Sequence, residues 1–103
     1  RGEFSKTTAV IDIHTSPASA FLNGTDIMVL VSGKGLNRKL AHAMADELEE
    51  RGLNVELKSA AKVNDIVEEA QKKTAGAVLL EFNPSRPMKR NGTIVGAALC
   101  EAR

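Results

Sequence analysis

Two short, uninterrupted apolar runs constrain the fold of this chain most. They are Ile27–Val31 and Ala77–Leu80, and neither contains a polar residue. A strand with one face in water alternates apolar and polar residues, whereas a continuously apolar strand is typically covered on both faces, as in parallel sheets. We therefore expect both runs to be interior strands of a sheet that helices cover.

The stretch between these runs has the pattern of two helices and a strand. A helix capped by Asn37 carries apolar residues at helical spacing over 40–48, and Gly52 is placed to end it in a left-handed conformation. Residues 55–57 alternate apolar and polar, which is typical of a strand near a sheet edge. A second apolar stripe at helical spacing over 63–70 predicts another helix.

The two ends of the chain add further strands. Residues 9–13 predict a short strand, and residues 93–99 predict a last strand, hairpinned onto 77–80 after the Asn91-Gly92 turn signal. From residue 27 the order is β-α-β-α-β-β, which indicates a three-layer α/β/α fold with a mixed, mostly parallel sheet. Right-handed crossovers place its first three strands in the spatial order second, first, third.

The length of 103 residues fits one domain. Residues 1–4 look like the scar of a cleaved expression tag, so we assign 1–8 to a flexible N-terminus and 9–103 to the domain, with its core at 26–100. No apolar run is long enough to cross a membrane, and we expect no signal peptide. The one cysteine, Cys100, cannot form an internal disulfide or a multi-cysteine zinc site. We therefore expect an intracellular protein, cytoplasmic or nuclear. We also expect no metal and no cofactor.

Charge is nearly balanced, with 14 Lys and Arg against 13 Asp and Glu, so nucleic-acid binding would need a local basic patch. The aromatic content of 3% also argues against base stacking. Parallel strands end at one crest, where we expect a basic stripe suited to phosphate backbones, while the acidic cluster 46–50 falls at the opposite end. The crest residues are Lys34, Arg38, Lys39, Lys58, Lys62, Arg86, Lys89 and Arg90. The alternative interpretation is an ordinary solvated rim.

Three other features have a functional and an ordinary interpretation. The loop 32–37 opens a helix and is either a phosphate-binding loop or, as we favour, a tight glycine connection. His14 follows Asp12 closely, which permits a catalytic pair, although an ordinary surface histidine is the favoured interpretation. Cys100 is interpreted as a small apolar residue. We assign no catalytic residue and no metal ligand from the sequence.

Several local patterns together resemble the anticodon-binding domain of class II aminoacyl-tRNA synthetases for Gly, His, Pro and Thr. The resemblance covers about Ile27 to Ala98. Its pieces are the strand Ile27–Val31, the helix, glycine and strand from Leu40 to Leu57, the helix Val63–Ala70, the strand Ala77–Leu80 and the turn and strand Asn91–Val95. No anticodon-reading residue of that family can be matched to a position here.

The resemblance implies a non-catalytic module that binds RNA, in particular tRNA, through the basic crest. An alternative is a protein-interaction or assembly module, because the predicted last strand is apolar on both faces and can pair with a partner protein or a second copy through Ile94, Val95 and Leu99. A third, less favoured hypothesis is a small phosphate- or nucleotide-binding enzyme or carrier of flavodoxin-like type.

Overall fold

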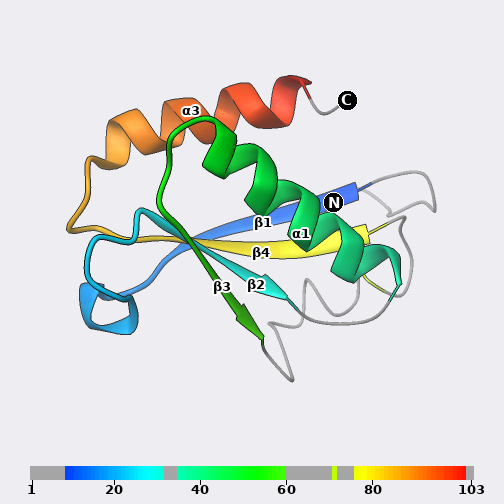
Figure 1. Ribbon diagram of the computed structural model, residues 1–103, viewed down its shortest axis with the longest axis horizontal. Helices are drawn as coiled ribbons and strands as arrows, with labels where there is room; N and C mark the ends of the chain where they lie inside the picture. The colour runs from blue at the N-terminus through cyan, green and yellow to red at the C-terminus, as the bar shows by residue number, and fades with distance from the viewer. Residues whose placement is uncertain (1–8, 32–34, 60–70, 72–75, 102–103) are drawn as a thin grey trace, which may run out of the picture.

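A four-stranded mixed sheet lies at the centre of the fold (Figure 1). The computed structural model describes residues 9–31, 35–59, 71 and 76–101. The elements in chain order are β1 (Ala9–Thr15), the short 3-10 helix η1 (Ala18–Ala20), β2 (Ile27–Val31), α1 (Leu36–Glu50), β3 (Val55–Ser59), β4 (Gly76–Phe82) and α3 (Met88–Glu101). The helix that the sequence predicts over 63–70 lies outside the described residues.

The strands lie in the order β1-β4-β2-β3. This confirms the predicted order of β3, β2 and β4, and it confirms that the two continuously apolar strands are interior. The alternating strand β3 is at an edge, as predicted, and β1 forms the other edge. The chain is therefore an α/β protein whose least polar strands occupy the centre of the sheet.

The direction of β4 differs from the prediction. β2 pairs with β3 in parallel and β1 pairs with β4 in parallel, but β2 and β4 are antiparallel. The sheet thus consists of two parallel pairs that run in opposite directions. The predicted mixed sheet is confirmed, and two of its three strand pairs are parallel. The expectation that β2, β3 and β4 end at one shared crest was wrong, because apolar content reports burial and not direction.

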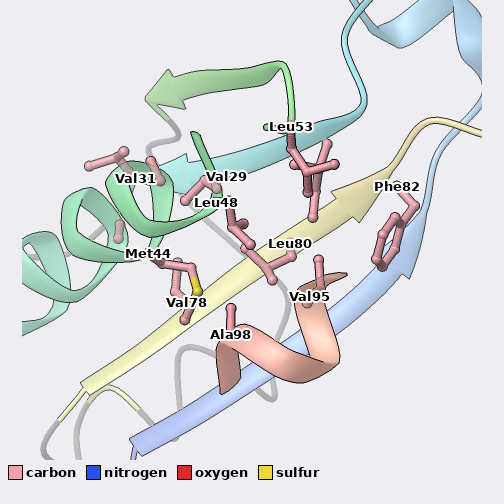
Figure 2. Packing of buried hydrophobic residues seen from close by; sticks show 13 residues of the cluster. Val29, Val31, Met44, Leu48, Leu53, Val78, Leu80, Phe82, Val95 and Ala98 are labelled. Carbon is pink, nitrogen blue, oxygen red and sulfur yellow. The ribbon is translucent and has the colours of Figure 1, made fainter. Parts of the chain in front are cut away.

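Both described helices pack on the same face of the sheet, where they build the core shown in Figure 2. Helix α1 contributes one stripe at helical spacing and α3 contributes another. Leu53 closes the core next to Gly52, whose φ of +94° confirms the predicted left-handed end of α1. The buried cluster comprises Ile27, Val29, Val31, Ala41, Met44, Ala45, Leu48, Leu53, Val78, Leu80, Phe82, Val95 and Ala98.

The C-terminal segment is a helix and not the predicted hairpin strand. Asn91, Val95 and Ala98 are buried at intervals of four and three residues, which matches one face of a helix. Pro87 immediately precedes α3, where its missing N–H and fixed φ suit a helix start. The β-branched run at 93–95 favoured a strand locally, but burial of this stripe against the sheet stabilises the helix. Within the described residues, neither helix is long and apolar enough to span a membrane.

Candidate acid–base site

The face of the sheet opposite α1 and α3 carries ionisable side chains in a row. Register pairs His14 with Glu81, Glu81 with Met28, and Met28 with Glu56, so one residue from each strand lies in this row. Met28 is buried but does not belong to the core cluster that its neighbours Ile27 and Val29 form, because successive side chains of a strand point to opposite faces. The row therefore lies on the second face.

Asp12 and His14 lie on this second face of β1, two residues apart. Nε2 of His14 is 2.9 Å from Oδ2 of Asp12. An ionised carboxylate only accepts hydrogen bonds, so in this contact Nε2 is the donor and the ring is oriented by Asp12. The His14 side chain is 49% exposed, so the imidazole is both oriented and accessible to solvent.

Glu81 is the interior neighbour of His14. It is half-buried on β4, between the edge strand β1 and the buried Met28 of β2. Neighbouring strands are separated by about 4.8 Å, so the imidazole and this carboxylate start from adjacent backbone positions on the same face. An oriented imidazole beside a second carboxylate is an arrangement that can transfer protons.

The segment 16–25 crosses the end of β4 on its way from β1 to β2. Ser16 N donates to the carbonyl of Phe82 at 3.3 Å, and Nδ2 of Asn83 donates to the carbonyl of Thr25 at 2.7 Å. At its far end, Oε1 of Glu56 accepts from the backbone N–H of Leu22 at 3.0 Å and from Oγ1 of Thr25 at 3.2 Å. Glu56 thus anchors this segment and does not belong to the proton-transfer pair.

A second polar cluster lies at the same end of the sheet and is centred on the buried Asp26. Its Oδ2 accepts from the backbone N–H of Asn54 at 2.8 Å. Its Oδ1 accepts from Nε of Arg86 at 3.0 Å and from Nδ2 of Asn91 at 3.2 Å. The carboxylate therefore connects the start of β2, the start of β3, the loop after β4 and the first turns of α3.

Opposing effects act on the pKa of Asp26. Burial raises this pKa, but the hydrogen bonds from Asn54, Arg86 and Asn91, together with the positive charge of Arg86, outweigh burial and place the pKa below the usual value of 3.8. Asp26 is accordingly ionised at neutral pH. Asn91 Oδ1 is buried in the same cluster without a hydrogen-bond partner among the described residues.

The structure separates the basic residues that the sequence placed on one crest. Arg38, Lys39 and Lys58 lie where α1 begins and β3 ends, whereas Arg86, Lys89 and Arg90 follow the antiparallel β4 at the opposite end of the sheet (Figure 1). The acidic residues 46–50 end α1, at the same end as Arg86. The prediction of a single basic crest was therefore wrong, because it assumed that β4 is parallel to β2. Of the predicted crest residues that the structure describes, only Arg38, Lys39 and Lys58 lie at the end opposite residues 46–50. Lys34 and Lys62 lie outside the described residues.

Other sequence candidates take structural positions. Ile94, Val95 and Leu99 are part of α3, where Val95 is buried and the other two pack against the core, so they form no exposed strand. Asn37 lies inside α1, which begins after Gly35, and its Oδ1 accepts from the backbone N–H of Ala77 at 3.0 Å. Cys100 is in α3. The described residues contain no group of three or more His, Cys, Asp or Glu that could hold a metal ion.

Glu81 is the functional candidate that sequence reasoning missed. In the sequence, Glu81 is marked only as an acidic residue that directly follows the apolar run Ala77–Leu80. Searches among family models, curated proteins and solved structures find no significant match to this chain.

Proposed function

We propose that His14 and Glu81 form an acid–base site for the hydrolysis of a small acyl compound, an ester or an amide. The observation that supports this proposal most directly is the position of His14. Its ring is oriented by Asp12 along β1, and its backbone position is paired with that of Glu81 across the parallel pair β1–β4. An exposed structural histidine needs neither partner, whereas a general base needs an orienting group and a nearby charge to stabilise its protonated form.

Each residue has a role that follows from its position. The imidazole of His14 accepts a proton from a water molecule as the water oxygen bonds to the acyl carbon. Glu81, as a carboxylate, stabilises the imidazolium that forms, and Asp12 keeps the ring oriented through Nε2. The imidazolium returns the proton to the leaving oxygen or nitrogen as its bond to the acyl carbon breaks, so one water is consumed and the site is regenerated.

The test is hydrolysis of three chromogenic probes: p-nitrophenyl acetate, an acetylated amino-acid p-nitroanilide and p-nitrophenyl phosphate. The variants are His14→Gln and Glu81→Gln. His42→Gln is the matched control, because His42 is exposed on α1, which packs on the opposite face of the sheet from the row. A general base contributes about 100-fold or more to a rate, so we expect that loss for His14→Gln, a loss of at least about tenfold for Glu81→Gln and no change for His42→Gln.

Three outcomes of this test contradict the proposal. The first is equal loss in His14→Gln and His42→Gln, which would mark nonspecific imidazole catalysis of the activated ester. The second is cleavage of the phosphate ester alone, which would indicate a different reaction class. The third is the absence of any hydrolysis by the folded chain.

RNA binding remains a second candidate, now on a smaller surface. Arg38, Lys39 and His42 surround a shallow hollow beside Gly35 and Asp46 at the start of α1. This surface suits the phosphate backbone that the resemblance to an anticodon-binding domain implies. Salt-dependent binding to labelled tRNA that weakens in the double variant Arg38→Gln/Lys39→Gln but not in Arg90→Gln would support it. Binding that is insensitive to salt or to the double variant would contradict it.

A further inference from the structure

Arg86 has an unusual combination of anchoring and exposure. Its Nε is 3.0 Å from Oδ1 of Asp26, whose side chain is only 2% exposed, while 36% of the Arg86 side chain is exposed. Among the described residues, only Asp26 forms a hydrogen bond and ion pair with this guanidinium. One edge of the planar group is thus fixed by the protein, and Nη1 and Nη2 supply further N–H donors.

The anchor itself is rigid. Besides Arg86, Asp26 accepts hydrogen bonds from the backbone of Asn54 and from the side chain of Asn91, which belong to different parts of the chain. The loop that carries Arg86 is also held, because Arg86 N donates to the carbonyl of Asn83 at 3.2 Å. An arginine held at its side chain and its backbone loses less conformational entropy when it binds a ligand.

Arg86 lies at the same end of the sheet as the acid–base site. β4 leads from Glu81 through Phe82 into the loop of Arg86, so both lie at the carboxyl end of β4, which is also the carboxyl end of β1 where His14 lies. A guanidinium presents paired donors that match the two oxygens of a carboxylate. Asp26 offsets one positive charge at this place, which favours a carboxylate group, with its one negative charge, over a phosphate group, which carries up to two.

We propose that Arg86 binds a carboxylate group of the substrate, with Asp26 as its positioning residue, and that the substrate is therefore a small acyl compound bearing a carboxylate. The identity of the substrate rests on the hydrolytic function proposed above. Carboxylate binding at Arg86 does not, because it can be measured without turnover. The two proposals thus fail independently.

The experiment is a titration of the isotope-labelled chain by NMR, at constant ionic strength, with succinate, acetate and inorganic phosphate as separate probes. The Arg86 Nε–H signal and the backbone amides of residues 85–88 are followed. We expect succinate to shift these signals and to bind about tenfold more weakly to Arg86→Lys, which keeps the charge but loses the paired donors. Lys89→Gln is the matched control, since it removes a neighbouring exposed cation, and it should change the affinity less than about twofold.

Each other outcome of the titration decides against the proposal. No shift of the Arg86 signal in the unmodified chain overturns it without any variant. Equal weakening by Arg86→Lys and Lys89→Gln shows attraction to net charge only. Tighter binding of phosphate than of succinate overturns the carboxylate assignment. His14→Gln should bind succinate like the unmodified chain, so loss of hydrolysis with retained binding separates this proposal from the catalytic one.

Discussion

Asp26 and Arg86 are 60 positions apart in the chain, yet Nε of Arg86 lies 3.0 Å from Oδ1 of Asp26. This contact connects the start of β2 with the loop after β4, which are neighbours because β2 and β4 are antiparallel. A buried carboxylate is costly unless its hydrogen bonds and charge are compensated, and three donors compensate it here. The pair therefore depends on the strand direction that distinguishes this sheet from a fully parallel one.

Loss of Arg86 should destabilise the fold. In Arg86→Gln the carboxylate of Asp26 remains buried but loses its charged partner, so we expect the free energy of unfolding to fall by about 2 kcal/mol. Urea unfolding followed by circular dichroism measures this change. Lys89→Gln, which removes a neighbouring exposed cation, should change stability by less than about 0.5 kcal/mol. Equal effects of the two substitutions would show that the contact with Asp26 contributes nothing specific.

The lowered pKa of Asp26 predicts a loss of stability in acid. Because the folded-state pKa lies below the usual 3.8, folding favours the ionised form, so this contribution is present above the unfolded-state pKa and is lost as the pH falls through the folded-state pKa. Unfolding free energies at about pH 6 and about pH 3 should differ less in Asp26→Asn than in the unmodified chain. Asp46→Asn, at an exposed position on α1, is the control and should keep the full difference. An unchanged pH dependence in Asp26→Asn would contradict the assignment.

Local patterns predicted most elements of this fold, but they did not predict the direction of β4. The interior strands, the edge strand β3 and the left-handed Gly52 all follow from residues close together in sequence. Burial of Ala77–Leu80 on both faces is equally compatible with either direction of β4, so the apolar pattern carries no signal for it. The prediction of a single basic crest was wrong for this reason.

The candidate site was only half visible in the sequence. Asp12 and His14 are close in sequence, so their pairing was considered from spacing alone. Glu81 is 67 positions from His14, and only the register of β1 with β4 brings them together. No pattern of neighbouring residues predicts a pairing over this distance. The sequence shows only that Glu81 is an ionisable residue at the end of an apolar run.

Leu48 should be a major source of core stability. It is fully buried on α1 and packs in the cluster of Figure 2 with Leu80 of β4 and other apolar residues. Leu48→Ala should lower the free energy of unfolding by about 3 kcal/mol, because it removes buried apolar surface and leaves a cavity. The same substitution at Leu22, which is 69% exposed, should cost less than about 0.5 kcal/mol. Similar losses in thermal or urea unfolding would contradict this assignment of the core.

Gly96 provides a direct test of whether the C-terminal segment is a helix. It lies inside α3 at an exposed position, its φ is not positive, and a Cβ added there meets nothing within 4 Å. Gly96→Ala should therefore raise the free energy of unfolding by about 0.5–1 kcal/mol, since alanine favours a helix and restricts the unfolded chain. Gly52→Ala is the matched control, because its φ of +94° is unfavourable for alanine, and it should cost about 1 kcal/mol. If residues 93–99 formed a strand, as their β-branched residues favour locally, Gly96→Ala would gain nothing from helix propensity. A free energy of unfolding that does not rise in Gly96→Ala would therefore contradict the helix.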